Sequence, residues 1–177
     1  MTHPSSGAAR GLALALTFTF ATTACGPLVR STYPATRWEG EASGLSAPVQ
    51  IYLDAMGVPH IFASNDDDAA LAVGFMHGRD RQFQMELIRL ASHGRLTELL
   101  GKSMLDTDRR LRLLSYKLEE AVANLVESDR RRVEAYCKGI NLAAEQTERP
   151  LEFKLLGHTP APWTARDVMA VGRFQSW

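Results

Sequence analysis

The stretch that decides the fold is residues 53–101, LDAMGVPHIFASNDDDAALAVGFMHGRDRQFQMELIRLASHGRLTELLG. Just before it, apolar and polar residues alternate over residues 49–53, which is typical of a strand with one buried face. Turn-forming residues follow at 54–57, and residues 58–63 read as a second short strand, so we predict a β-hairpin. Pro59 cannot donate a ladder hydrogen bond, and its strand should therefore lie at an edge or begin irregularly.

The rest of this stretch has helical periodicity. Asn65 or Asp66 can cap a helix whose acidic first turn suits the positive end of the helix dipole. The pattern runs to about residue 77 and continues or restarts over residues 80–92. A shorter helix is predicted over residues 96–100, where a glycine follows as a stop signal.

Three more helices are predicted towards the C-terminus. The clearest covers residues 106–125, with leucine and valine at steps of three and four. Ser128 should cap the next, through residue 144, whose first turn carries Arg130 to Arg132 as a solvated or paired face rather than a nucleic-acid patch. A proline-bearing loop over residues 150–163 precedes a capping box at Thr164, from which the last helix runs to the end of the sequence.

The composition is that of a globular domain. Hydrophobic residues make up 45% and charged residues 23% of the 177 residues. The 20 basic residues balance the 20 acidic ones, so no net charge attracts the chain to nucleic acid. We therefore expect no nucleic-acid partner.

The N-terminal segment predicts export. Residues 1–24 carry a charge, then the apolar run of residues 11–24, then small residues, which is the order found in a signal peptide rather than in a buried N-terminal helix. Cys25 follows in a context similar to a bacterial lipobox, although Thr22 occupies the position where such motifs have leucine. We expect a periplasmic protein that Cys25 would anchor by lipid to the outer membrane, with residues 25–47 as a tether.

The usual catalytic patterns are missing from the sequence. It has no glycine-rich phosphate loop, no H-E-x-x-H and no G-x-S-x-G. Cys137 is expected to be a small half-buried residue, since no histidine flanks it in a nucleophile pattern. The scattered histidines are expected to be surface or hydrogen-bonded side chains rather than metal ligands. They are His60, His77, His93 and His158.

Five short motifs nevertheless occur in a fixed order between residues 49 and 177. They are Asp54-x-x-Gly57-Val58-Pro59-His60-Ile61, Ala72-x-Gly74-x-x-His77-Gly78-Arg79-Asp80-Arg81-x-Phe83-Gln84-Met85-Glu86-Leu87, Gly94-Arg95-Leu96-x-Glu98, Tyr136-Cys137-Lys138-Gly139-Ile140-Asn141, and Glu152-Phe153-x-x-Leu156-Gly157-x-x-Pro160-x-Pro162-Trp163. Together they resemble the start of the penicillin acylase family, which includes penicillin G acylases, cephalosporin or glutaryl acylases and acyl-homoserine-lactone acylases.

The resemblance implies a fold and separate roles for two chains cut from one precursor. In the family a precursor is cut into an α chain and a β chain, which together form an αββα N-terminal-nucleophile hydrolase. The nucleophile is the first residue of the β chain, usually serine, and its own α-amine serves as the base. Residues 48–177 would be an incomplete α-chain domain of the α+β class, mostly helical with an N-terminal hairpin.

The same resemblance implies what this chain lacks. It assigns no catalytic, cofactor or metal residue to this chain, and it allows calcium only in the complete enzyme. Ser176 is rejected as the nucleophile because Trp177 follows it, where the family pattern has asparagine. The partners would be a β chain of the same precursor and a small amide substrate, and this chain alone would be inactive.

One motif suggests a structural role. Asp80, Arg81, Gln84 and Glu86 are costly to bury unless they pair with one another, so we predict a buried polar network that holds their helix in place.

Two other interpretations of the whole chain stay open, an exported lipoprotein that serves as a binding module and a truncated, non-functional remnant. Since the hairpin would lack its sheet partners, we also expect the isolated product to aggregate or remain partly molten.

Overall fold

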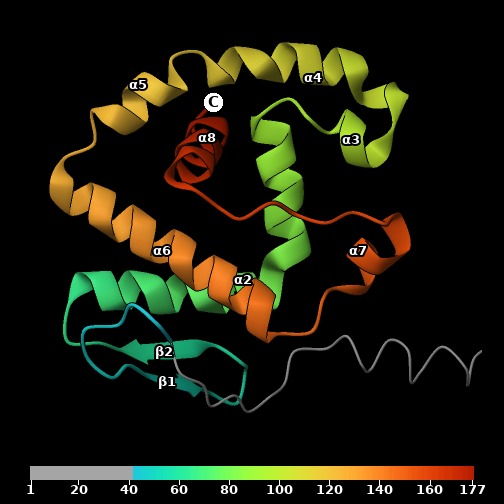
Figure 1. Ribbon diagram of the computed structural model, residues 1–177. Helices are drawn as coiled ribbons and strands as arrows, with labels where there is room; N and C mark the ends of the chain where they lie inside the picture. The colour runs from blue at the N-terminus through green and yellow to red at the C-terminus, as the bar shows by residue number, and fades with distance from the viewer. Residues whose placement is uncertain (1–41) are drawn as a thin grey trace, which may run out of the picture. The chain divides into compact units, whose positions relative to one another are not determined.

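The computed structural model describes residues 42–177 and contains mostly helices plus one antiparallel hairpin (Figure 1). Cys25, the predicted signal peptide and most of the tether lie outside these residues. The elements are β1 Gln50–Leu53, β2 Pro59–Phe62, α2 Asp66–Ser92, α3 Thr97–Leu100, η1 Lys102–Met104, α4 Leu105–Leu111, η2 Arg112–Ser115, α5 Leu118–Ala123, α6 Glu127–Gln146, α7 Leu151–Leu156 and α8 Ala165–Gln175. No helix among the described residues is long and apolar enough to span a membrane.

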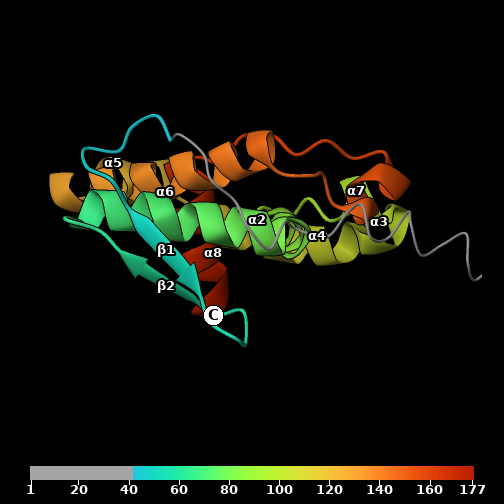
Figure 2. The same ribbon diagram turned by 90° about the horizontal axis from the view of Figure 1, so that it is seen from below.

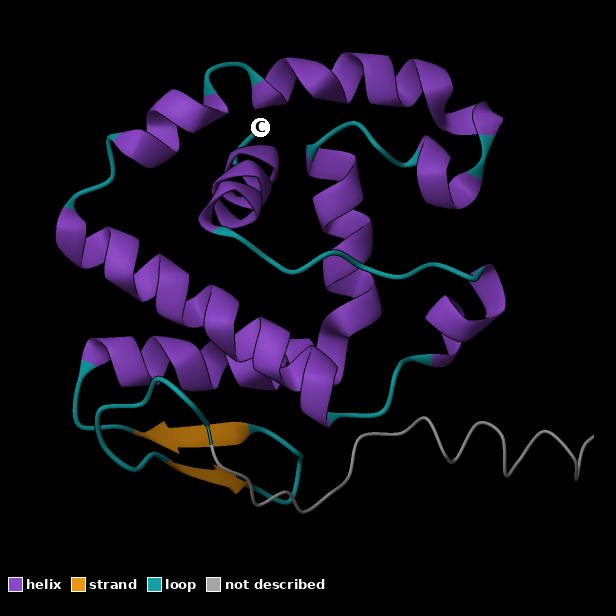
Figure 3. Cartoon of the chain, in the orientation of Figure 1, coloured by secondary structure: helices purple, strands orange, loops and turns teal. Residues whose placement is uncertain are grey.

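The hairpin forms where it was predicted (Figure 3), although Leu53, which the alternation placed on the buried face, is exposed. Ile51 is paired with Ile61, and both pack on a core cluster that includes Phe75 of α2. The Asp54 carboxylate accepts hydrogen bonds from the backbone N–H groups of Met56 and Val58 at 2.8 and 2.9 Å, and so holds the turn. The prediction of a hairpin over this segment is confirmed.

Helix α2 is long and sharply bent (Figure 1). Asn65 caps it, because its side chain accepts a hydrogen bond from the Asp68 N–H at 2.8 Å. The backbone at Arg81 has φ −134° and ψ 19°, outside the helical region, and the two halves of α2 point in different directions. The two expected helical stretches are therefore one helix with a bend.

The first half of α2 crosses α6 at very short range. A Cβ atom on Gly74 would overlap with the carbonyl oxygen of Tyr136, and one on Gly139 would overlap with that of Leu71. A Cβ atom on Gly78 would lie 2.9 Å from the Ala143 Cβ atom. Glycine at these three positions allows the two backbones to touch, which accounts for two glycines of the second motif and for Gly139 in the fourth.

The predicted continuous helix over residues 106–125 is wrong. The structure breaks it into α4, η2 and α5, with Lys117 in the left-handed region at φ 53°. The break exposes backbone carbonyls, and Arg173 of α8 donates to those of Leu114 at 2.9 Å and Tyr116 at 2.6 Å. Breaking the helix also allows Leu111 and Leu118 to be buried on either side of the turn.

The remaining helices agree with the predictions in outline. Helix α6 begins at Glu127, one residue before the predicted cap, and its first-turn arginines are paired. Arg131 lies 3.3 Å from Asp67 and Arg132 lies 3.4 Å from Asp66, so the acidic first turn of α2 compensates them. Helix α7 was expected to be loop, while the capping box of α8 at Thr164 is confirmed.

Candidate functional site

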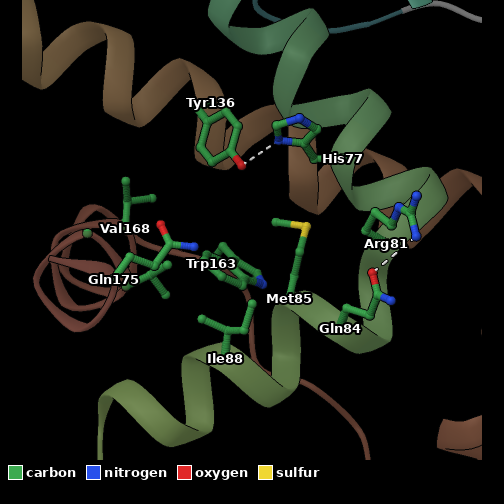
Figure 4. Close-up of a pocket in the computed structure, with 11 residues that line it drawn as sticks. His77, Arg81, Gln84, Met85, Ile88, Tyr136, Trp163, Val168 and Gln175 are labelled. Carbon is green, nitrogen blue, oxygen red and sulfur yellow. Dashed lines mark hydrogen bonds between the residues drawn. The ribbon is translucent and has the colours of Figure 1, made fainter. Parts of the chain in front are cut away.

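One pocket in the described residues lies inside the bend of α2, between α2, α6 and α8 (Figure 4). Its volume is about 500 Å³. Apolar side chains from α2, α8 and the segment that precedes α8 form most of its wall. These are Met85, Ile88, Trp163, Val168 and Val171.

Polar groups form the rim of this pocket. His77 Nδ1 lies 2.9 Å from the Tyr136 hydroxyl, and burial raises the pKa of Tyr136. Arg81 Nη1 donates to Gln84 Oε1 at 3.3 Å (Figure 4). No aspartate or glutamate is among the residues that line the pocket, so its electrostatic character is set by Arg81.

The floor of the pocket is a small apolar core. Cys137, Ile140 and Trp163 are buried there, with partly buried neighbours around them. Burial raises the pKa of the Cys137 thiol to about 12, so it is protonated at neutral pH and is a poor nucleophile. Cys137 is thus a packed small residue, but it is buried rather than half-buried as predicted.

A series of contacts between buried charged side chains connects the second half of α2 to the segment before α8. Glu86 is only 2% exposed and its Oε2 atom lies 2.6 Å from Arg89 Nη2, although the two groups are not aligned for a hydrogen bond. His158 Nε2 lies 2.8 Å from the other Glu86 oxygen. Arg89 also donates to the Ala161 carbonyl at 2.8 Å and lies over the Trp163 ring at 5.1 Å.

This series of charged contacts continues into α8. His93 Nε2 lies 2.9 Å from Asp167 Oδ1, and Arg166 Nη1 lies 3.1 Å from His93 Nδ1. A guanidinium can only donate, so Nδ1 must accept and the ring carries its proton on Nε2, towards Asp167. Burial alone would raise the pKa of Asp167, but hydrogen bonds from His93 and Thr164 hold that pKa below its usual value.

The predicted network of Asp80, Arg81, Gln84 and Glu86 needs a correction. Arg81 and Gln84 do meet, but on the exposed surface at the bend, and Asp80 is exposed beside Arg79 at 3.6 Å. Only Glu86 is buried, because it lies on the opposite side of α2.

The true partners of Glu86 were not predicted from the sequence. Arg89 lies three residues further on, at the helical spacing that could have suggested an ion pair. His158 comes from 72 residues away, and no local pattern pointed to it.

The described residues show no assembled catalytic group around Ser176, Cys137 or the histidines. Ser176 is exposed and its hydroxyl donates to the Gly172 carbonyl at 2.8 Å. His60, His77, His93 and His158 each have a side-chain partner, as expected. Within residues 42–177, no group of three or more His, Cys, Asp or Glu side chains is placed to hold a metal ion.

Comparison with known proteins identifies relatives of known type. Residues 48–177 match the family model for penicillin amidase. The chain is 39% identical over 133 residues to the penicillin acylase 2 proenzyme of Pseudomonas sp. (strain SE83), covering 73% of this chain and 17% of that protein. It is 34% identical over 142 residues to the acyl-homoserine lactone acylase QuiP of Pseudomonas fluorescens (strain Pf0-1), covering 78% and 17%. The chain thus spans about a sixth of these curated relatives.

A solved structure has the same fold. The chain superposes on the thermostable penicillin G acylase from Alcaligenes faecalis with a TM-score of 0.66 and 25% identity, covering 73% of this chain and 75% of the matched chain. The shared portion is therefore most of both chains. Because the family model matches residues 48–177, this chain belongs to the penicillin amidase family.

Proposed function

We propose that this chain is the N-terminal α portion of an amide hydrolase of the penicillin or acyl-homoserine lactone acylase type. The match to the family model carries the proposal, and the fold supports it. Residues 48–177 match the family, while the fold matches most of one chain of a penicillin G acylase. A β portion of the same precursor would complete the αββα fold.

In this proposal the two portions have different roles. The β portion supplies a serine at its own N-terminus, whose free amine takes the hydroxyl proton as the oxygen attacks the amide carbonyl. Donors in the β portion hold the oxyanion that forms. This chain supplies helices and part of the acyl pocket. The buried Cys137 and the hydrogen-bonded Ser176 fit a nucleophile that comes from outside the chain.

The proposed substrate class follows from the relatives. Their names include penicillin acylase and acyl-homoserine lactone acylase. Both reactions release an apolar acyl group from an amide with a small polar amine. We propose the same class here, without a choice between β-lactam and homoserine-lactone amines.

Export and a lipid anchor are part of the proposal. Residues 1–24 would be removed and Cys25 would carry the lipid at the periplasmic face of the outer membrane. Replacement of Cys25 by serine should move the chain from the membrane fraction to the soluble periplasmic fraction. A wild-type chain that is already soluble would contradict the anchor and leave the enzymatic proposal intact.

The proposal is tested by co-expression of the chain with the reading frame downstream of it. Mass spectrometry of the purified product should find two chains, the second beginning with serine followed by asparagine. Replacement of that serine by alanine should abolish hydrolysis of amides while the chains still co-purify. A downstream frame that encodes no such β portion would favour the truncated remnant.

A further inference from the structure

We infer that the pocket inside the bend of α2 receives an apolar side chain of the β portion, with a carboxylate of that portion on Arg81. This inference rests on the proposed function and names the contact by which the two portions recognise each other. Three observations support it. The apolar core beneath the pocket is bordered by partly buried side chains, exposed apolar side chains also lie outside the pocket, and Arg81 places a positive charge at the pocket's rim.

The core under the pocket is bordered by apolar side chains that are only partly buried. Cys137, Ile140 and Trp163 are buried, at 5%, 1% and 9% exposure. Met85 and Val168 pack against them but remain half-buried, and their free surfaces line the pocket (Figure 4). A further apolar group in the pocket would complete this core as interior side chains do elsewhere in proteins.

The apolar surface extends beyond the pocket, which favours a protein partner over a small ligand. The hairpin and the C-terminal end of α8 project from the same face of the helical layer (Figure 2). Tyr52 and Phe62 of the hairpin are 57% and 59% exposed and Trp177 is 84% exposed. Exposed large aromatic side chains on these two elements are typical of a surface for association.

The rim of the pocket indicates the charge of the partner. Within residues 42–177 no carboxylate pairs with Arg81, whose hydrogen bond to Gln84 is to a neutral amide. Its neighbour Arg79, by contrast, lies 3.6 Å from Asp80. An exposed guanidinium beside an apolar pocket without acidic residues suits a partner that brings a carboxylate next to an apolar side chain.

The test is capture of the β portion by the tagged chain after co-expression. Met85→Asp places a charge in the pocket and Arg81→Glu reverses the charge at its exposed rim. Each should reduce the captured β portion by about tenfold or more, which is the effect of a central contact in an interface. Met85→Leu and Arg81→Lys should retain it. Leu155→Asp is the matched surface control, since Leu155 is 74% exposed on α7 and does not line the pocket.

The outcomes separate this inference from the proposed function. A wild-type chain that captures no β portion contradicts both. Capture that survives both Met85→Asp and Arg81→Glu contradicts this inference alone. Because Arg81 is exposed, the second variant remains informative even if Met85→Asp fails to fold.

The pocket could instead hold a second copy of this chain or a small acyl ligand. Each would give a distinct experimental result, and either result would overturn the inference. A second copy would make two differently tagged copies of this chain co-purify from the co-expressed sample, and Arg81→Glu would separate them. A small acyl ligand would make phenylacetate or octanoate raise the melting temperature of the complex, with the effect lost in Met85→Asp.

Discussion

Gly139 of α6 lies so close to the Leu71 carbonyl of α2 that any Cβ atom at position 139 would overlap with that oxygen. The contact brings the fourth family motif against the helix that carries the second. It also sets the distance between the two longest helices, and with it the position of the apolar core under the pocket.

Gly139→Ala should therefore destabilise the complex strongly. The added methyl group must push α2 and α6 apart, and overpacking of this kind costs about 1–3 kcal/mol. The melting temperature of the co-purified complex should fall by several degrees. Glu134→Ala is the control, because Glu134 is exposed on α6 and does not line the pocket, and this change should leave the melting temperature nearly unchanged.

The buried pair of Glu86 and Arg89 should behave as a unit. Glu86→Leu leaves Arg89 buried without its nearest carboxylate, a change that costs about 3–5 kcal/mol. The double replacement Glu86→Leu with Arg89→Met should recover part of that loss, since both charges are then removed. A double-mutant cycle on the denaturant stability of the complex measures the coupling. Additive losses would show that the two side chains act independently.

Stability should fall in acid partly through Asp167. Its pKa is lowered in the folded state, so its contribution is fully present above the unfolded pKa of about 3.9 and is lost as the pH falls towards the folded value. In Asp167→Asn the decline in melting temperature between pH 5 and pH 3 should be shallower. Asp106→Asn, at an exposed site, should retain the wild-type slope.

The isolated chain should lack a sharp two-state melt. One small hairpin and two small buried clusters leave much apolar surface open, which favours aggregation or a molten state. Cys137 provides the probe, since in a folded core its thiol is protonated and inaccessible. With Cys25 replaced by serine, a thiol reagent should label the isolated chain readily and the complex slowly. Slow labelling and a cooperative melt of the isolated chain would refute this prediction.

Much of the fold could be predicted from local patterns. Alternation identified the hairpin around Ile51 and Ile61, and the capping box at Thr164 marked the start of α8. The break at Lys117 could not be predicted, because the regularly spaced leucines continue through it. The backbone carbonyls that the break leaves without helical partners accept hydrogen bonds from Arg173, which lies far along the chain.

The candidate site was harder to predict. Arg81 and Glu86 belong to one motif, yet they point to opposite sides of a bent helix. His158 reaches Glu86 only because the loop before α8 folds back across α2. The pocket depends on three helices whose crossing no local signal specifies.

The central claim is that this chain is one portion of a two-portion acylase, and amide hydrolysis tests it most directly. Two preparations are compared on phenylacetyl and acyl-homoserine-lactone amides, residues 25–177 alone and the same residues co-expressed with the downstream reading frame. The account predicts hydrolysis only in the second preparation. Hydrolysis by residues 25–177 alone would contradict it, because the nucleophile would then lie within this chain.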